Sequence, residues 1–255
     1  VSFSKAMPIW IKDKLFQKNY LFNKLKGHDE NYKSDENIFF SDHHLSHAAS
    51  AFFPSPFKDA VVITADGVGE WATTTVAVGR ENNLEIKKEI HFPHSLGLLY
   101  SAFTYYLGFK VNSGEYKLMG LAPYGKPLFK DLIIEKVLDL KEDGSFKLDM
   151  NYFDYATGLT MTNNKFSKLF AQPARDPQKD LLKEFHMNIA ASIQAVTEEI
   201  ILRITKNISS KYKIKNLCLA GGVALNCVAN GKILKEKIFE KIWIQPAAGD
   251  AGGSL

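Results

Sequence analysis

Three histidines occur within five residues of the sequence, and the spacing of two of them suits metal binding. His43 and His47 are four residues apart, and His44 lies between them. Because residues four apart share one face of a helix, His43 and His47 can present two imidazoles to one metal ion, whereas His44 points elsewhere. Histidine pairs with this spacing also occur as partly buried or capping side chains, so the spacing alone leaves both interpretations open.

Two acidic turns could complete such a site. The β-branched run 60–65 predicts a buried strand, and Asp66 begins the turn after it. Gly67 and Gly69 give this turn accessible amides, which can face a phosphate while the aspartate faces its metal. A later predicted strand leads into a second turn, which contains Asp250. Each aspartate also has a structural interpretation, because Asp-Gly is commonly a plain turn and Asp250 could be a helix N-cap.

A third turn, Gly221 and Gly222, follows the predicted strand 216–220 and precedes Asn226. Glycines allow a ligand to approach the backbone, and the following helix N-terminus supplies amides for an anion or nucleotide. This pattern predicts a nucleotide cradle. The alternative is a tight strand-to-helix turn with a packing glycine.

Two further pairs of residues could do chemistry. Glu115 and Lys117 interrupt the otherwise apolar segment 114–125, where charges usually have an assigned partner, either each other or a ligand. His91 and His94 lie between a predicted strand and a predicted helix. Histidines in such places are more often structural, and a general base acting on a hydroxyl is the alternative.

Hydrophobic patterns predict the elements that must position these residues. Helices are expected at 10–25, 95–109 and 129–138, and along an apolar stripe from Leu181 to Ile204. A proline-bracketed turn at 170–177 precedes this stripe. Strands are expected at 38–40, 60–65, 72–79, 84–91, 216–220 and 241–244, with a short strand pair around 141–144. Repeated strand, glycine turn and helix units predict an α/β protein with two lobes closing on a cleft.

Composition excludes several classes of protein. The 32 basic and 28 acidic residues give a net charge of +4, which is too small to predict a nucleic-acid surface. No apolar run approaches the roughly 20 residues of a membrane span, and no signal peptide is recognisable. Cys218 and Cys227 lie among small apolar residues and are expected to be buried, reduced thiols in a cytoplasmic protein. Both ends of the sequence look truncated.

Seven motifs together resemble the NodU/CmcH-type O-carbamoyltransferases. They lie at 43–52, 66–70, 95–100, 114–125, 173–175, 221–226 and 249–252. The motifs occur in the order found in that family, and they cover nearly the whole sequence after about residue 38.

The resemblance implies a two-lobed actin-like ATPase fold, similar to the TsaD-type domain and incomplete at both ends. Residues 1–37 would be a leading segment packed on the first lobe, residues 38–170 the first lobe with insertions, and residues 171–255 the second lobe. The YrdC-like domain that follows in the family is absent from this chain, so the fragment alone is expected to be inactive.

The resemblance also assigns roles to individual residues. Metal ligands would be His43, His47, Asp66 and Asp250, of which the first three are also catalytic; the divalent metal would be iron, with zinc and manganese as alternatives. ATP-derived groups would contact Gly67, Gly69, Glu115, Lys117, Gly221, Gly222, Asn226 and Asp250. No role follows for His44 or Arg175.

The activity implied by the resemblance is transfer of a carbamoyl group from carbamoyl adenylate, made from carbamoyl phosphate and ATP, to a hydroxyl of a sugar-like acceptor. Partners would include the linked YrdC-like domain, but neither nucleic acid nor a membrane. One alternative is a non-catalytic module that binds nucleotide and metal. Another is threonylcarbamoyl transfer to tRNA, which is disfavoured by the mild charge and by the motif at 43–47.

Overall fold

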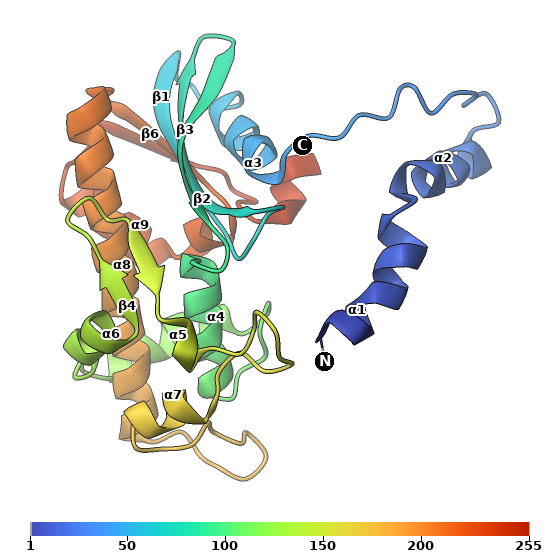
Figure 1. Cartoon of the computed structure of the whole chain (residues 1–255). Coiled ribbons are helices and arrows are strands. Elements are labelled where there is room, and N and C mark those ends of the chain that lie inside the picture. The colour runs from blue at the N-terminus through green and yellow to red at the C-terminus, as the bar shows by residue number, and fades with distance from the viewer. Residues whose placement is uncertain (1, 255) are drawn as a thin grey trace.

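The computed structural model describes residues 2–254 and contains a five-stranded mixed sheet (Figure 1). The strand order is β3-β2-β1-β6-β7. The strands are β1 (Asp59–Ala65), β2 (Ala72–Arg80), β3 (Asn83–His91), β6 (Asn216–Ala220) and β7 (Lys241–Ile244). β2 runs antiparallel to both β1 and β3, whereas β6 runs parallel to both β1 and β7. The strands predicted at these five places are therefore confirmed.

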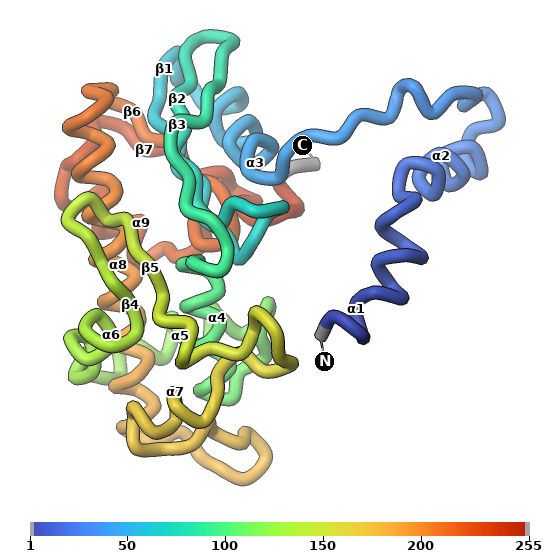
Figure 2. The backbone as a smooth tube through the Cα atoms, viewed as in Figure 1, coloured from blue at the N-terminus to red at the C-terminus, as the bar shows by residue number. Residues whose placement is uncertain are grey.

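The central strand β1 is buried on both faces, which explains its unbroken β-branched sequence. One face packs against α3 (His43–Phe52), with Ala48 and Phe52 against Val62. The other face packs against α4 (Leu96–Tyr106) and α8 (Glu184–Tyr212), as the backbone trace in Figure 2 also shows. The sheet is thus the middle layer between helices.

The long helix α8 carries most of the apolar stripe that the sequence indicates. Its buried positions include Ile189, Ile193, Val196, Ile200 and Ile204. The helix begins later than predicted, because Lys183 is its N-cap and Leu181 lies before it with 83% of its surface exposed. The start of the stripe therefore belongs to the preceding loop.

The remaining helices and strands lie below the sheet or beside α8 (Figure 1). They are α5 (Glu115–Leu121), α6 (Lys130–Lys136), β4 (Leu138–Leu140), β5 (Phe146–Leu148), α7 (Asn164–Leu169) and α9 (Cys227–Lys235). The predicted helix at 129–138 and the short strand pair are confirmed, and β4 pairs with β5. No helix in the part of the chain that the structure describes is long and apolar enough to cross a membrane.

The amino-terminal segment is helical, as predicted for residues 10–25, but its packing differs from the prediction. It forms α1 (Ser2–Ile9), a π-helical turn (Trp10–Lys14) and α2 (Gln17–His28). This segment lies to one side of the sheet and of the helices packed on it (Figures 1 and 2). No residue of the π-helical turn or of α2 is buried, so the expected packing on the first lobe is not seen. Residues 38–40 are not a strand either, because no described strand pairs with them and Phe39 is 86% exposed.

The structure does not divide into two sheets at residue 170. Strand β1, from the expected first lobe, pairs directly with β6, from the expected second lobe. Val62 is opposite Cys218 in this pairing. Residues 38–170 and 171–255 therefore contribute to one mixed α/β unit, because the parallel pairing of β1 with β6 joins the two halves through backbone hydrogen bonds.

Candidate metal centre

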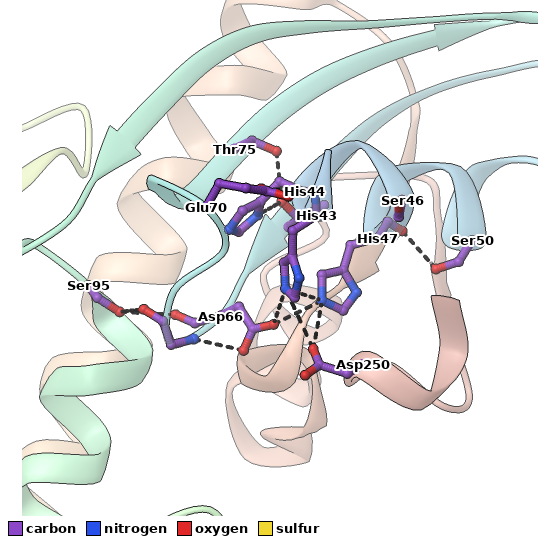
Figure 3. Close-up of polar contacts among 12 residues, drawn as sticks. His43, His44, Ser46, His47, Ser50, Asp66, Glu70, Thr75, Ser95 and Asp250 are labelled. Atoms are coloured by element: carbon purple, nitrogen blue, oxygen red, sulfur yellow. Dashed lines mark hydrogen bonds and ion pairs between the residues drawn. The ribbon is translucent and has the colours of Figure 1, made fainter. Parts of the chain in front are cut away.

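The helix α3 presents His43 and His47 on one face, as their spacing predicts (Figure 3). Their Nε2 atoms lie 3.1 Å apart. The helix N-terminus is held by Glu70, whose two carboxylate oxygens accept from the backbone N–H of His43 at 3.0 Å. An acidic group there satisfies a free amide and interacts favourably with the helix dipole. Glu70 thus fixes the end of the helix that carries His43.

Asp66 and Asp250 come to the same place from two strands. Asp66 directly follows β1, and Asp250 begins the 3-10 helix (Asp250–Ser254) that comes after β7. Because β1, β6 and β7 are parallel, their carboxyl ends meet at one edge of the sheet. Asp66 Oδ2 lies 3.2 Å from His43 Nε2 and 2.9 Å from His47 Nε2. Asp250 Oδ1 lies 3.5 Å and 3.4 Å from the same two atoms.

This geometry fits a divalent cation. The four ligand atoms, one from each residue, all lie within 4.8 Å of one another. With metal–ligand bonds of about 2.1 Å, neighbouring ligand atoms are about 3.0 Å apart in an octahedral site and about 3.4 Å apart in a tetrahedral one. The distances between the histidines and the aspartates, 2.9–3.5 Å, are close to these two values. Two imidazoles and two carboxylates suit iron, zinc and manganese alike.

The site is buried on one side and open on the other. The side chain of His47 is 3% exposed, whereas that of Asp250 is 81% exposed. Burial alone would raise the pKa of Asp66. Hydrogen bonds from His47, from the Gly67 amide at 2.7 Å and from His43 outweigh that effect and hold the pKa well below its usual range. Asp66 therefore carries a negative charge that can neutralise a bound cation.

His44 points away from the cluster, as its helical position predicts. Its Nδ1 lies 2.6 Å from Thr64 Oγ1, which lies 2.7 Å from Thr75 Oγ1. All three side chains are buried, and burial is the main reason that the pKa of His44 is lowered. The close approach of α3 needs Gly69, since a Cβ there would lie 3.0 Å from the His44 ring. His44 therefore ties α3 to the sheet.

The glycine turn after β6 packs against the Asp66 turn. Gly221 has a φ of 87°, and an added Cβ would lie 2.3 Å from the carbonyl oxygen of Ala65. At Gly222 the added Cβ would lie 3.1 Å from Asp66 Oδ1. β1 is followed by β2 on one side of it in the sheet, whereas β6 is followed by β7 on the other side. Ligands of open α/β sheets bind where the connections after two neighbouring strands lead in opposite directions. Both predicted glycine turns lie at that position.

Asn226 belongs to a buried side-chain network. Its amide group exchanges hydrogen bonds with the amide of Gln194 at 3.0 and 3.1 Å. Its Oδ1 also accepts from the backbone N–H of Ala229 and caps α9. Gln194 in turn bonds Tyr100 and Glu198. These contacts support the structural interpretation of Asn226 over contact with a nucleotide.

Glu115 and Lys117 do not join the four-residue cluster. Glu115 accepts from Ser101 Oγ at 2.8 Å and from the backbone N–H groups of Asn112 and Gly114. Lys117 is exposed, with its Nζ 5.9 Å from the centroid of the Tyr116 ring. The Glu115 carboxylate therefore stabilises the loop at 112–114 that precedes it.

His94 and Arg175 both make contacts within the fold. His94 Nδ1 accepts from the backbone N–H of Leu148 at 3.1 Å, and burial lowers the pKa of this imidazole. The guanidinium of Arg175 donates from Nε to the carbonyl oxygen of Leu107 at 2.6 Å and lies over the Phe109 ring. His91 is exposed and pairs with Glu89 at 2.6 Å.

Glu70 and Ser95, two residues that position the site, are not among the residues predicted from sequence patterns. Glu70 belongs to the turn 66–70, and its helix-capping role depends on a contact with His43, 27 positions away in the sequence. Ser95 Oγ lies 2.6 Å from the carbonyl oxygen of Gly67 and also accepts from the backbone N–H of Leu98. The N-cap preference of serine before an apolar helix could have identified Ser95. No local signal marks Glu70.

The fold and the four-residue cluster define a mixed α/β domain with a candidate metal centre. The whole chain, residues 1–255, matches the family described as Carbamoyltransferase N-terminus, and the protein belongs to that family. The uncharacterized protein sll1178 of Synechocystis is 60% identical over 255 residues, which are all of this chain and 41% of that protein.

Two nodulation proteins are also similar. NolNO of Sinorhizobium fredii is 40% identical over 220 residues, which are 86% of this chain and 30% of NolNO. NolO of Bradyrhizobium diazoefficiens is 34% identical over 216 residues, which are 84% of this chain and 37% of NolO. The chain thus spans less than half the length of these curated relatives.

Proposed function

We propose that this chain is the metal-binding part of an O-carbamoyltransferase, which transfers a carbamoyl group from carbamoyl adenylate to a hydroxyl of a sugar-like acceptor. The observation that carries this proposal is the meeting of His43, His47, Asp66 and Asp250 at one sheet edge. Family membership gives the type of group transferred, and the cluster gives a place for its electrophilic activation.

The residues of the cluster and the nearby glycine turns have different proposed roles. A bound divalent cation would act as a Lewis acid toward a phosphate or carbamoyl oxygen. His43 and His47 direct their Nε2 atoms into the site, and Asp66 supplies a negative charge. Exposed Asp250 stands at the open side, where a substrate would enter. The nearby glycine turns offer backbone amides to an anion.

The proposal extends to fold and cofactors. A strand followed by an acidic glycine turn and two antiparallel strands is the expected opening of an actin-like lobe, and we infer that the observed sheet is one such lobe. ATP-derived groups would lie against the turns at Gly67, Gly69, Gly221 and Gly222. The position of these turns after the parallel strands β1 and β6, where open α/β sheets bind ligands, supports this placement. Iron is the proposed metal, and a YrdC-like domain the proposed source of carbamoyl adenylate.

The metal centre is tested directly by binding. The chain is freed of metal with a chelator, dialysed and titrated with Fe²⁺, Zn²⁺ or Mn²⁺. We expect about one ion per chain, and loss of that ion in His47→Ala, because removing one of four ligands costs most of the affinity. His28→Ala, on the exposed amino-terminal segment, is the matched control and keeps the ion. Full metal binding by His47→Ala would contradict the proposed site.

Catalysis is tested by joining the chain to a YrdC-like domain and supplying carbamoyl phosphate, ATP and hydroxyl acceptors. We expect carbamoyl transfer that His47→Ala abolishes. Binding of metal and ATP without any transfer would instead identify a non-catalytic binding module.

A further inference from the structure

A cavity of about 730 Å³ lies at the end of the parallel strands opposite to the metal centre. It is lined by residues of the loop between α8 and β6 and of the loop between α9 and β7. These loops lead into the amino ends of β6 and β7, whereas the metal centre lies at the carboxyl ends. β6 has five residues at about 3.3 Å each, so about 16 Å of strand separates the two places. The cavity is therefore distinct from the metal centre.

Part of the lining is apolar. Two buried residues, Ile214 and Phe239, line the cavity together with Leu234, which is 63% exposed. Small-molecule sites usually have volumes of about 300–1,000 Å³ and combine apolar residues with a few polar groups. The size and the apolar residues of this cavity therefore suit the carbon skeleton of a small organic ligand.

Three lysines line the same cavity, and two of them have free ammonium groups. Lys215 pairs at 2.7 Å with Glu240, which also lines the cavity. Among the residues that the structure describes, none forms an ion pair or a hydrogen bond with the ammonium group of Lys213 or Lys237. Three ammonium groups and one carboxylate leave two positive charges at the cavity, which attract an anion.

The two free lysines have an unusual backbone conformation. Lys213 directly follows α8 and has a φ of 54°, and Lys237 lies two positions after α9 and has a φ of 52°. Glycine is the usual residue in this left-handed conformation after a helix, because a side chain makes it less favourable. In the described part of the chain five residues other than glycine have a positive φ, and two of them line this cavity. Lysine thus occurs twice where glycine would be less strained.

The helix dipoles do not account for these two lysines. A cation near a helix C-terminus is favourable, but α8 already has Lys211 in its last turn, and α9 has Lys235. These residues provide the interaction from helical positions, without a positive φ. Binding of an anion explains why ammonium groups are also present at Lys213 and Lys237.

We propose that this cavity binds a small organic phosphate, with its phosphate held by Lys213 and Lys237 and its apolar part against Ile214 and Phe239. Lysine is a common phosphate ligand, and the two positive charges of the cavity match the charge of a phosphate monoester near pH 7. The site goes beyond the proposed carbamoyl transfer and does not depend on it.

The test follows binding of phenyl phosphate to the isotope-labelled chain through backbone amide shifts in NMR spectra. A chelator keeps the chain free of metal, so that the phosphate cannot coordinate a cation at the metal centre. We expect saturable shifts at Lys213, Lys237 and Phe239. Inorganic phosphate and phenol should each bind at least about tenfold more weakly, because each provides only one of the two parts that the cavity recognises.

The double variant Lys213→Gly, Lys237→Gly should bind phenyl phosphate about tenfold more weakly or less. Glycine relieves the left-handed backbone at both positions, so the variant is expected to fold, and thermal unfolding checks this. Lys165→Ala removes an exposed lysine of α7, far along the chain from both loops, and is the control with normal binding.

Three results would overturn the phosphate site. They are absence of shifts at the cavity, equal binding of phenyl phosphate by the double glycine variant and the unmodified chain, and equal binding of inorganic and phenyl phosphate. The metal titration of the unmodified chain tests the proposed function separately, because the two sites lie at opposite ends of the parallel strands.

Discussion

His47 Nε2 lies 2.9 Å from Asp66 Oδ2, although the two residues are 19 positions apart and come from a helix and a strand. This contact joins α3 to the end of β1 at the most buried part of the candidate metal centre. The site is therefore expected to depend on the protonation of Asp66, on the backbone conformation at Gly221 and on the contact of Thr64 with His44.

Stability of the metal-free chain should fall in acid partly because of Asp66. Hydrogen bonds from two histidines and the Gly67 amide overcome the opposing effect of burial and lower the pKa of Asp66 in the folded chain. An unfolded aspartate has a pKa of about 3.9, so the stabilisation is complete above about pH 5 and is lost as pH falls toward the lower, folded pKa. Urea unfolding with chelator from pH 6 to 3.5 measures this loss.

Asp66→Asn should show a shallower loss of unfolding free energy over the same range, because it has no charge to lose. Asp13→Asn, on the exposed amino-terminal segment, should follow the unmodified chain. Equal acid sensitivity in the Asp66→Asn and unmodified chains would refute this role of Asp66.

Gly221→Ala should destabilise the chain and weaken metal binding. The residue has a φ of 87°, and the new Cβ would lie 2.3 Å from the Ala65 carbonyl oxygen, next to Asp66. We expect a loss of about 1–3 kcal/mol in unfolding free energy, since the backbone must shift. Thermal unfolding and metal titration provide the two readouts.

Gly231→Ala is the matched control for that substitution. Gly231 lies inside α9, and nothing lies within 4 Å of its added Cβ. It should leave metal binding unchanged and stabilise the helix by up to about 1 kcal/mol. Similar losses in both variants would show that the Gly221 turn has no special requirement.

Thr64→Val should lower both stability and metal affinity. It removes the hydroxyl that lies between His44 and Thr75, and it leaves buried polar atoms without that partner. The expected cost is about 1–3 kcal/mol. Thr104→Val is the control, because its hydroxyl only adds a bond to a helix carbonyl within α4, and it should keep normal metal affinity. Unchanged metal binding by Thr64→Val would mean that His44 does not position the helix.

Asn226→Ala and Gln194→Ala should have coupled effects on stability. The two amides exchange two hydrogen bonds, so the second substitution should cost less once the first is present. A double-mutant cycle by urea unfolding measures the coupling, which we expect at about 1 kcal/mol or more. Additive losses, together with weaker nucleotide binding by Asn226→Ala alone, would instead favour the nucleotide cradle.

Much of the local structure could be predicted from the sequence. The spacing of His43 and His47 indicated a shared helix face, and the β-branched run at 60–65 indicated the buried strand β1. Both follow from periodicity within a few residues. Prediction failed at residues 38–40 and at Leu181, because an apolar residue becomes part of an element only where something covers it.

The sequence by itself determined which residues could ligate a metal and which elements carry them, because helical and strand periodicities act over a few neighbouring residues. Only the tertiary structure decided that residues 38–170 and 171–255 share one sheet and that Asp66 and Asp250 lie beside the histidines. It also decided that the Asn226 side chain joins a buried hydrogen-bond network. The physical reason is that strand pairing and side-chain packing join residues distant in the chain. Their partners become known only when the chain has folded.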